Sequence, residues 1–512
     1  MRHLTIPQLI ETQSQVYGDK LALVEDRFSF SFKEVDILST NVAMNLVEHG
    51  LNSGDRVALW APNMSEWVLA AIGVQKAGGV IVPINTRMKG KEAAYILNSS
   101  QAKILFSVHH FLGINYFELL KDEDLPHLES SISFDAKESI DGCLMFEPLL
   151  SIGHEVALPL VDPSDLADII FTSGTTGKPK GVMTTHVQNI QVFDYWSRYI
   201  GLNETDQYLI VNPFFHTFGY KAGWLASIMR GATAHPFAVF DANKILETIH
   251  THKISMLPGP PTLYQSILSS PDLADADISS LRLGVTGAAS IPVQLIKDMK
   301  EVLGFETIVT AYGLTESTGV VTMCTPEDDY ETIATTSGCA IEGVEVKCID
   351  ANGNSVQAGE PGEILVKGYN VTSGYFNDVE ATNEAIDIEG WLHTGDIGIL
   401  DARGYIKITD RSKDMFIVGG FNAYPAEIEN ILCDHPAISQ AAVIGIEDKR
   451  MGEVAKAFII LKPDETLSIQ TLTQWCKENM ANYKVPREIE FTQDLPTNAA
   501  GKVMKYILKN GS

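Results

Sequence analysis

Residues 168–182 read DIIFTSGTTGKPKGV, an apolar run that leads into small hydroxyl and glycine residues and then two lysines, Lys178 and Lys180. Glycine lets backbone N–H groups turn toward an anion, hydroxyls donate hydrogen bonds, and lysine adds a compact positive charge. The stretch therefore predicts a strand followed by a phosphate-binding loop. Only two residues separate Gly174 from Gly177, where a Walker A loop needs four, so a P-loop ATPase is disfavoured.

Outward from this loop, the chain alternates helix-like segments with short apolar runs. This alternation predicts α/β architecture, with parallel sheets covered by helices. The expected helices and strands are residues 39–48, 56–60, 66–77, 80–84, 207–211, 243–252, 254–257, 293–303 and 307–311. The chain has no G-x-G-x-x-G, G-x-S-x-G or H-E-x-x-H motif, so nicotinamide enzymes, serine hydrolases and zincins lack their main sequence support.

The pattern changes twice toward the C-terminus. From residue 344, Gly- and Asn-rich turns separate short alternating strands, which predicts an antiparallel, barrel-like region. After residue 410, the last hundred residues have their own pattern, with helices expected over 426–432 and 472–480 and strands over 438–446, 454–461 and 489–491. We therefore expect a large N-terminal domain, residues 1–410, and a small α+β domain, residues 411–512.

Composition narrows the function further. The 512 residues are 45% hydrophobic, which is ordinary for a globular protein, and 38 Lys and Arg against 65 Asp and Glu give a net charge of −27. Such a field repels polyanions, so nucleic-acid binding is disfavoured. We find neither an export signal nor a membrane span, and the six cysteines contain no C-x-x-C pair, so we expect a cytoplasmic protein.

Five motifs occur in a fixed order along residues 172–502. They are TSGTTGKPKG at 172–181, YGLTE at 312–316, WLHTGD at 391–396, DRSKDMFIVGGFNAYP at 410–425 and PTNAAGK at 496–502. Together they resemble the signature motifs of the adenylate-forming superfamily of acyl-CoA synthetases, luciferases and adenylation domains. The resemblance implies a mobile C-terminal domain and an acid–thiol ligase, an AMP-forming acyl-CoA synthetase that uses ATP, Mg²⁺ and CoA.

The same resemblance assigns roles around ATP. Attack of a carboxylate on the α-phosphate sets anion against anion, so the site must supply cations, donors and a metal. Glu316 and Thr175 would bind Mg²⁺, Thr315 would contact the α-phosphate, Tyr312 would stack on adenine, and Asp396 would bind the ribose with Arg411. The other residues implied to bind the nucleotide are Thr172, Ser173, Gly174, Thr176, Gly177, Lys180, Gly287, Ala288, Ala289 and Gly313.

Lys502 resembles the catalytic lysine of the family, which bridges the carboxylate and the α-phosphate during adenylation. Lys413 matches the hinge between the domains, and Gly419 and Gly420 would let the CoA arm pass close to the backbone. A lone lysine near a chain end is otherwise usually a solvated side chain. The acyl pocket is expected from residues 211–224 and 257–264, with His216 gating the carboxylate tunnel and further contacts from Phe218, Gly219 and Trp224.

The resemblance implies that the substrate is a small carboxylic acid. Residues 211–224 contain no Asp or Glu to pair an ammonium group, which disfavours an amino acid. Residues 213–223, 257–266, 310–316 and 322–329 resemble the branch of CoA ligases that activates the propanoate of the steroid C and D rings. A medium-chain or alicyclic acid fits the aromatic segment equally well. A stand-alone enzyme that loads a carrier protein is the alternative, and an oligomer is compatible with the sequence.

Overall fold

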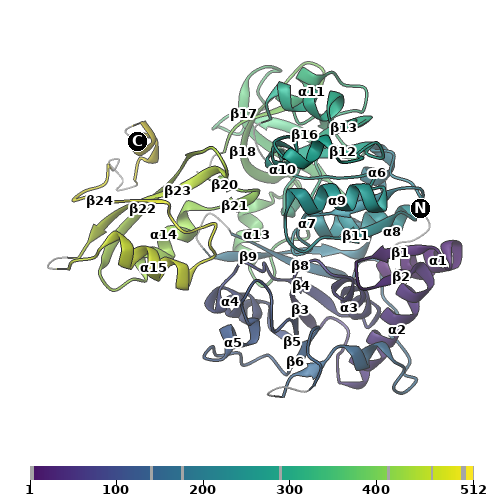
Figure 1. Cartoon of the computed structure of the whole chain (residues 1–512). Coiled ribbons are helices and arrows are strands. Elements are labelled where there is room, and N and C mark those ends of the chain that lie inside the picture. Colours follow the sequence, from purple (N-terminus) through teal and green to yellow (C-terminus); the bar gives the residue numbers. More distant parts are fainter. Residues whose placement is uncertain are drawn as a thin grey trace.

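The structure is a computed structural model that describes residues 5–138, 142–173, 178–287, 291–411, 415–462, 465–496 and 503–510. Two parallel sheets form the body of a large N-terminal domain, and a small C-terminal domain lies beside it (Figure 1). The α/β class and the large and small units predicted from the sequence are thus confirmed. Among the described helices, none is both long and apolar enough to cross a bilayer.

The first sheet has the strand order β7-β6-β5-β3-β4-β8-β9. Its pairings are parallel except for the last, where β9 runs antiparallel to β8. These strands are β3 (Arg56–Trp60), β4 (Val80–Pro83), β5 (Ala102–Ser107), β6 (Ser130–Ser133), β7 (Leu144–Met145), β8 (Leu166–Ser173) and β9 (Pro179–Thr185). The predicted phosphate loop therefore joins the two strands at one edge of this sheet.

The second sheet is assembled from two four-stranded parts that meet at Met256. Met256 forms single parallel bridges with Tyr208 on one side and Leu283 on the other. The segment 254–257, predicted as a strand, also joins the two parts by backbone hydrogen bonds: the N–H of Leu209 donates to the Met256 carbonyl, and the N–H of Leu257 donates to the Leu283 carbonyl. The strands are β1 (Leu21–Val24), β2 (Ser29–Ser31), β10 (Gln207–Ile210), β11 (Thr233–Pro236), β12 (Leu283–Gly287), β13 (Thr307–Tyr312), β14 (Thr322–Met323) and β15 (Cys339–Ala340).

Helices cover both sheets, and their starts follow local capping. Ser31 and Glu34 form a capping box, so α2 begins at Phe32 rather than near residue 39. Helix α3 is buried on nearly all sides, because Trp67 contacts Trp224 and Gln75 donates to the Tyr220 hydroxyl. The longer helices of the large domain are α1 (Ile6–Tyr17), α2 (Phe32–Glu48), α3 (Ser65–Lys76), α4 (Gly90–Ser100), α6 (His186–Tyr199), α9 (Ala242–His252), α10 (Pro261–Leu268) and α11 (Val293–Glu301).

Shorter helices fill the connections. The short α-helices are α5 (Tyr116–Leu120), α7 (Thr217–Gly219), α8 (Ala226–Arg230), α12 (Tyr330–Thr335) and α13 (Val379–Ala385). The 3₁₀ turns are η1 (Glu147–Leu150), η3 (Pro271–Ala274) and η4 (Thr315–Ser317), and η2 (Tyr220–Leu225) is a π-helix. Single π-turns are rare and occur mostly at functional sites, which draws attention to η2.

The region from residue 344 is antiparallel, as its turns predict. It forms one path in the order β16-β17-β18-β19. These strands are β16 (Val344–Ile349), β17 (Pro361–Gly368), β18 (Leu392–Leu400) and β19 (Ile406–Arg411). Four strands are too few to close a barrel, so the path is a sheet that leads the chain toward the small domain.

The small domain has its own sheet and core. Its strands follow the order β21-β20-β23-β22, with β24 beside β23. The elements are β20 (Phe416–Val418), β21 (Phe421–Ala423), α14 (Pro425–Cys433), β22 (Ile438–Asp448), β23 (Gly452–Leu461), α15 (Ile469–Asn479), β24 (Glu488–Phe491) and α16 (Lys505–Asn510). All five elements predicted here are confirmed, because each apolar period matches its buried face.

Candidate active site

Strands β8 and β9 hold the two ends of the predicted phosphate loop. Thr172 lies opposite Lys180 in their antiparallel register, so a hydroxyl and an ammonium group leave the hairpin at matching positions. The side chain of Ser173 lies outside the described residues, and so do the four loop residues Gly174, Thr175, Thr176 and Gly177. The structure therefore places the strands that flank the loop, and the phosphate contacts of the loop itself stay predictions.

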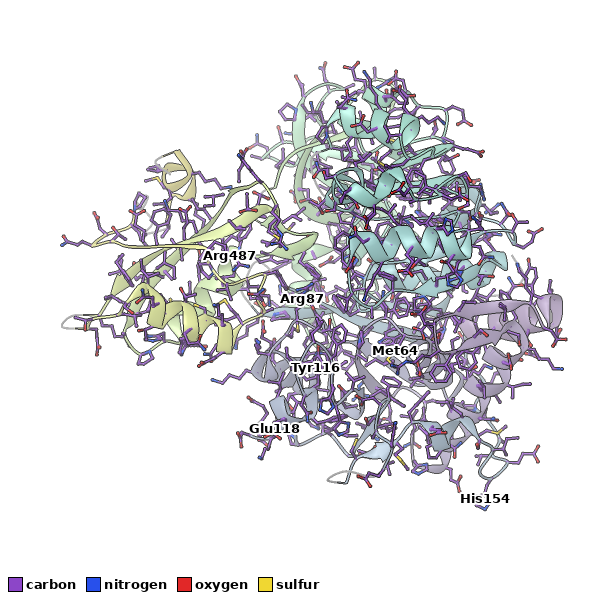
Figure 2. All side chains as sticks on the ribbon, in the orientation of Figure 1. Met64, Arg87, Tyr116, Glu118, His154 and Arg487 are labelled. Atoms are coloured by element: carbon purple, nitrogen blue, oxygen red, sulfur yellow. The ribbon has the colours of Figure 1, made fainter. Side chains whose placement is uncertain are left out.

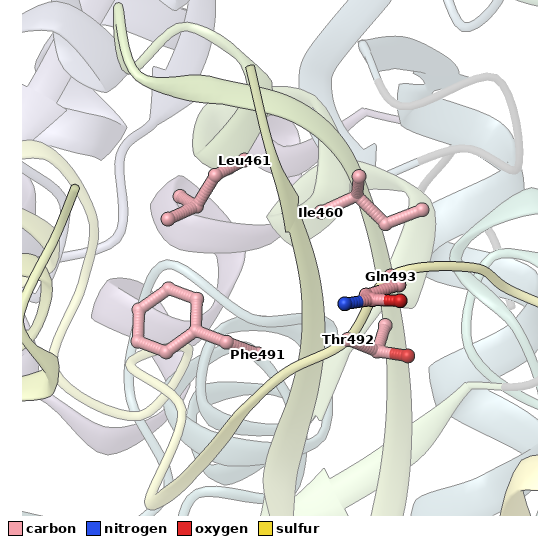
Figure 3. Close-up of a pocket in the computed structure, with 5 residues that line it drawn as sticks. All are labelled: Ile460, Leu461, Phe491, Thr492 and Gln493. Carbon is pink, nitrogen blue, oxygen red and sulfur yellow. The ribbon is translucent and has the colours of Figure 1, made fainter. Parts of the chain in front are cut away.

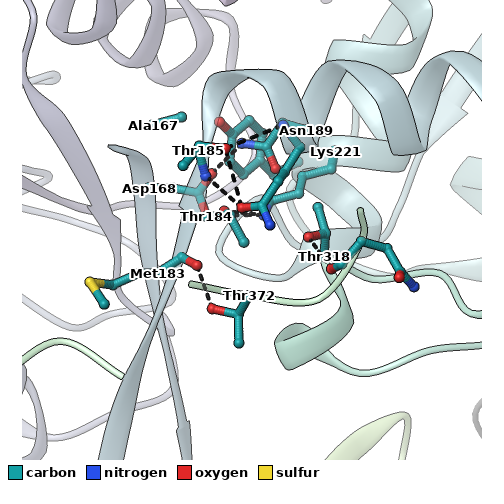
Figure 4. A network of polar contacts seen from close by, with 12 residues as sticks. Ala167, Asp168, Met183, Thr184, Thr185, Asn189, Lys221, Thr318 and Thr372 are labelled. Carbon is teal, nitrogen blue, oxygen red and sulfur yellow. Dashed lines mark hydrogen bonds and ion pairs between the residues drawn. The ribbon is translucent and has the colours of Figure 1, made fainter. Parts of the chain in front are cut away.

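A buried polar network ties this hairpin to the rest of the domain (Figure 4). Asp168 Oδ1 on β8 accepts from Thr184 Oγ1 at 2.6 Å and faces Lys221 Nζ at 3.0 Å, and its Oδ2 accepts from Asn189 Nδ2 at 2.6 Å. Lys221 also donates to Thr184 Oγ1 at 2.8 Å. Burial lowers the pKa of Lys221, an effect that the neighbouring Asp168 opposes. The network thereby joins β8, β9, α6 and η2 at one point.

Glu316 lies close to the hairpin although it is far away in sequence. Its Oε1 accepts from Thr172 Oγ1 at 3.2 Å and from Tyr375 Oη at 3.0 Å. Lys180 Nζ lies 5.3 Å from the centre of the Tyr375 ring. Burial, together with the Glu316 carboxylate, raises the pKa of Tyr375 far above its usual range, so the phenol stays protonated and donates. Tyr375 is a site residue that the sequence analysis missed.

The oxygen atoms around Glu316 fit a magnesium ion. Mg²⁺ prefers hard oxygen ligands and is usually held by one or two carboxylates, waters and substrate phosphates. Glu316, Thr172 and Tyr375 supply a carboxylate and two hydroxyls. Among the described residues there is no group of three or more His, Cys, Asp or Glu side chains that could hold a metal by themselves. The donor set therefore suits an ion that arrives with a nucleotide.

A tight turn places Glu316 at the end of β13. A Cβ built at Gly313 would lie 2.2 Å from the carbonyl oxygen of Gly319, so the two chain segments can approach only because Gly313 has no side chain. Thr315 begins η4 and is half-buried. The backbone N–H of Thr372 donates to the Glu316 carbonyl at 2.8 Å, which ties the turn to the segment that contains Tyr375.

Tyr312 and Asp396 meet at the predicted nucleoside end of the site. The Tyr312 hydroxyl donates to Asp396 Oδ2 at 2.7 Å, although the two residues lie on the separate strands β13 and β18. Asp396 also lies opposite Arg411 in the register of β18 and β19. The side chain of Arg411 lies outside the described residues, so the structure brings together the tyrosine and the carboxylate, and their positions are compatible with a flat base and a ribose diol.

Of the three small residues predicted to face the adenine base, the structure describes one. Gly287 ends β12 opposite Ala311, and a Cβ built there would lie 3.2 Å from the Ala311 carbonyl oxygen. Ala288 and Ala289 lie outside the described residues. Gly287 therefore lies close to β13, the strand that ends at Tyr312.

His216 stands at the start of the acyl segment. Its Nδ1 accepts a hydrogen bond from the Phe218 backbone N–H at 3.2 Å, which orients the ring. The side chain reaches solvent, yet protein surrounds it on most sides, and this desolvation lowers the pKa of His216 to about 4. The imidazole is therefore neutral at physiological pH.

The rest of the acyl segment is shaped by close contacts. A Cβ built at Gly219 would lie 2.2 Å from the carbonyl oxygens of both Asn212 and Pro213, so the bend requires glycine. Phe218 is half-buried. Trp224 is fully buried and stacks on Tyr220 with ring centres 5.0 Å apart. Trp224 is therefore a core residue of η2 in this arrangement, and its part in an acyl pocket stays a prediction.

The turn between β20 and β21 faces the large domain. Gly419 and Gly420 have φ values of +56° and +87°, which explains why both are glycine. A Cβ built at Gly420 would lie 3.3 Å from Pro260 Cγ of the large domain. Phe421, the next residue, stacks on Phe215 with ring centres 6.4 Å apart. The predicted CoA residues therefore lie against the acyl segment of the large domain.

Two further predictions lie outside the described residues: the catalytic Lys502 and the hinge Lys413. The analysis also missed Asp168 and Lys221, whose pairing spans 53 positions of sequence. Neither these residues nor Tyr375 belongs to a motif with fixed spacing, so only the fold could reveal them.

A surface hollow lies elsewhere. It measures about 370 Å³ and lies on the small domain beside the ends of β23 and β24 (Figure 3). Its lining is Ile460, Leu461, Phe491, Thr492 and Gln493, without a titratable side chain. The hollow therefore lacks the groups that acid activation requires, unlike the cluster around Glu316.

Comparisons with known proteins show the family of the chain. The family described as "AMP-binding enzyme" matches residues 10–376, and "AMP-binding enzyme C-terminal domain" matches residues 427–502. A relative from Rhodococcus jostii, the 3-[(3aS,4S,7aS)-7a-methyl-1,5-dioxo-octahydro-1H-inden-4-yl]propanoyl:CoA ligase, is 43% identical over 99% of this chain and 98% of its own length.

Solved structures of o-succinylbenzoate CoA synthetase from Bacillus subtilis are similar over 98% of both chains at 29% identity. A double mutant of that enzyme bound to a product analogue, OSB-NCoA, gives a TM-score of 0.85. The same enzyme in complex with AMP gives 0.69. The overall arrangement of the present chain is thus more similar to the first structure than to the second.

Proposed function

This chain belongs to the AMP-binding enzyme family as an AMP-forming acid–CoA ligase, and we propose that its substrate is a propanoate attached to an alicyclic ring system. The observation on which this rests is the 43% identity, over nearly the whole chain, to a ligase of a bicyclic propanoate. The acyl segment agrees with an uncharged ring system, because residues 211–224 are aromatic and glycine-rich and contain no carboxylate.

The reaction has two steps that use ATP, Mg²⁺ and CoA. In the first step, a carboxylate oxygen of the acid attacks the α-phosphorus, the bond to the β-phosphate breaks, and pyrophosphate leaves. In the second step, the CoA thiol loses its proton, sulfur attacks the acyl carbonyl, and AMP leaves. When bound, Mg²⁺ would neutralise phosphate charge in the first step. The residues of the chain must therefore hold ATP, the acid and CoA in turn.

We assign the first step to the cluster around Glu316. Its carboxylate with Thr172 would hold the metal, and the Tyr375 hydroxyl fixes the orientation of Glu316 through its 3.0 Å hydrogen bond. Lys180, at the end of the hairpin, would neutralise phosphate charge. Asp396 would accept from the ribose hydroxyls and Tyr312 would stack on adenine, positions that their mutual hydrogen bond supports. Lys502 would arrive from the small domain, on the far side of the boundary proposed near residue 410.

We assign the second step to the face where Gly419 and Gly420 meet Pro260 and Phe215. Two glycines in the left-handed region leave no side chain between backbone and large domain, as a narrow thiol channel requires. We place the protein in the cytoplasm, which agrees with the absence of disulfides among the described residues, all six cysteines included. Its partners are then small molecules, and an oligomer is neither required nor opposed by this site.

The substrate assignment is tested by AMP formation over a panel of acids, each with and without CoA. We expect the bicyclic ring propanoate to give a kcat/KM at least about 10-fold above octanoate, since one or two well-filled ring contacts are worth about 1–3 kcal/mol. AMP turnover should require CoA and give a thioester. Faster turnover with octanoate would overturn the ring assignment, and pyrophosphate exchange that ignores CoA would favour a carrier protein as acceptor.

The nucleoside assignment gives a separate prediction. Tyr312→Phe keeps the ring but removes the hydrogen bond to Asp396, and bonds to charged groups are worth about 1.5–3 kcal/mol, so KM for ATP should rise about 10-fold. The KM for the acid should stay within about twofold. Steady-state kinetics with varied ATP would measure both.

Tyr405→Phe is the matched control, because the Tyr405 hydroxyl donates to Asp328 Oδ1 at the same distance of 2.7 Å outside the proposed site. It should leave KM for ATP unchanged. Equal effects of the two variants would show that Tyr312 acts on stability rather than on the nucleotide.

A further inference from the structure

Lys484 is a buried cation at the boundary between the two domains. It follows α15 in the small domain, and its Nζ lies 2.7 Å from Glu427 Oε1 of the same domain and 2.7 Å from Glu92 Oε1 of the large domain. The side chains of Lys484, Glu92 and Glu427 are only 1%, 9% and 5% exposed. A lysine and a glutamate from different domains therefore share a dry contact.

The contact is well defined on the large-domain side. Glu92 lies in the first turn of α4, and its Oε2 accepts from the backbone N–H of Lys89 at 2.8 Å, so the carboxylate is oriented before Lys484 reaches it. Burial alone would lower the pKa of Lys484, but Glu427, Tyr483 and Glu92 together raise it well above its usual value. Lys484 is therefore a cation whose burial depends on its carboxylate partners.

Aromatic contacts continue the same interface. Tyr483, the residue before Lys484, stacks on Phe421 with ring centres 5.0 Å apart, and Phe421 stacks in turn on Phe215. The Arg87 guanidinium lies 4.8 Å from the centre of the Phe421 ring, where the large domain meets the small one (Figure 2). Phe421 directly follows Gly419 and Gly420, so the position of Lys484 is coupled to the turn assigned to CoA.

The arrangement of the domains indicates which step this contact serves. Two structures of o-succinylbenzoate CoA synthetase differ in their similarity to this chain. The form bound to a CoA product analogue gives a TM-score of 0.85, and the AMP complex gives a TM-score of 0.69. Identity and coverage are the same in both comparisons, so sequence divergence does not explain the difference. The contact between Lys484 and Glu92 therefore belongs to the arrangement in which the Gly419–Gly420 turn meets the large domain.

We propose that Lys484 and Glu92 are a positioning pair for the thioester-forming step, which holds the small domain in its CoA arrangement and is broken during adenylation. The proposal rests on the two-step function given above. Among the described residues, the polar partners of Lys484 and Glu92 include none of the groups assigned to ATP. When the domains separate, Lys484 keeps Glu427 as its partner within the small domain, while Glu92 is exposed to water as an ordinary helix-capping residue. The pair therefore favours one arrangement without making the other one costly.

Glu92→Ala tests this proposal in the full-length enzyme with two assays. Thioester formation from supplied acyl-adenylate and CoA should fall about 10- to 100-fold, since truncating one partner of a buried charge pair has effects of this size. Adenylation, measured as pyrophosphate exchange without CoA, should stay within about twofold or rise. Glu92→Asp should restore part of the thioester rate, because a carboxylate is again present.

Glu429→Ala is the matched control, since Glu429 pairs with Lys505 at 2.7 Å within the small domain. In this variant, the rates of adenylation and of thioester formation should both stay within about twofold of wild type. A uniform loss of both rates in Glu92→Ala would show a merely structural role, and unchanged rates would show that the pair positions nothing. Either result overturns the proposal. A wild-type enzyme that makes no thioester would instead overturn the function on which it rests.

Discussion

Lys502→Ala is expected to lower the rate of adenylation about 10²- to 10³-fold and to leave thioester formation from a supplied acyl-adenylate within about twofold. Losses of this size follow when one preorganised group that stabilises developing charge is removed. Lys502 would meet the incoming carboxylate and the α-phosphate only in the first step, where two anions approach each other. Pyrophosphate exchange measures the first step, and release of AMP from added acyl-adenylate with CoA measures the second.

Lys509→Ala serves as the control for Lys502→Ala. Lys509 is an exposed lysine of α16, seven residues further along, so the substitution removes the same charge from the same part of the small domain. It should change neither rate by more than about twofold, because an exposed lysine contributes little beyond long-range charge. Loss of both half-reactions in Lys502→Ala would contradict the division of labour between the two steps.

Lys221→Met is expected to lower the free energy of unfolding by about 3–5 kcal/mol, which is typical when one partner of a buried ion pair is removed and the other charge remains. Lys221 and Asp168 are both 0% exposed, and Asp168 would keep uncharged partners such as the Thr184 hydroxyl and the Asn189 amide. Denaturant unfolding followed by tryptophan fluorescence can measure the loss, because Trp224 is buried three residues after Lys221.

Two further variants sharpen this test. The double variant D168N with Lys221→Met removes both charges and should recover part of the loss, since an uncharged buried network leaves no unpaired ion. Lys253→Met breaks an exposed ion pair with Asp277, 57% and 43% exposed, and should cost no more than about 1 kcal/mol. Equal destabilisation by Lys221→Met and Lys253→Met would contradict the importance assigned to burial.

The same network also bears on catalysis. Asp168 and Thr184 lie on β8 and β9, whose far ends flank the phosphate loop, and Lys221 lies in η2, within the predicted acyl segment 211–224. One buried ion pair therefore fixes the phosphate side and the acyl side relative to each other. Lys221 in η2 is directed toward the hairpin, where its Nζ contacts Thr184 and Asp168.

Local sequence predicted the elements well where periodicity and capping act alone. The helix over 66–77 and the strands over 56–60 and 80–84 match α3, β3 and β4, because their apolar patterns are unambiguous. The segment 254–257, predicted as a strand, hydrogen-bonds through its backbone to both halves of the second sheet, and its partners lie far along the chain. The start of α2 was placed seven residues too late, because the capping box at Ser31 was overlooked.

The sequence by itself indicated the class of chemistry, because the hydroxyl, glycine and lysine residues of 172–181 predict a phosphate-binding loop, and the five ordered motifs resemble those of the adenylate-forming superfamily. Only the tertiary structure decided how these pieces meet. Tyr375 beside Glu316, Lys221 beside Asp168 and Lys484 beside Glu92 are contacts between distant segments. Such pairs have no sequence spacing of their own, because sheet order and domain docking, rather than local propensity, bring their charges together.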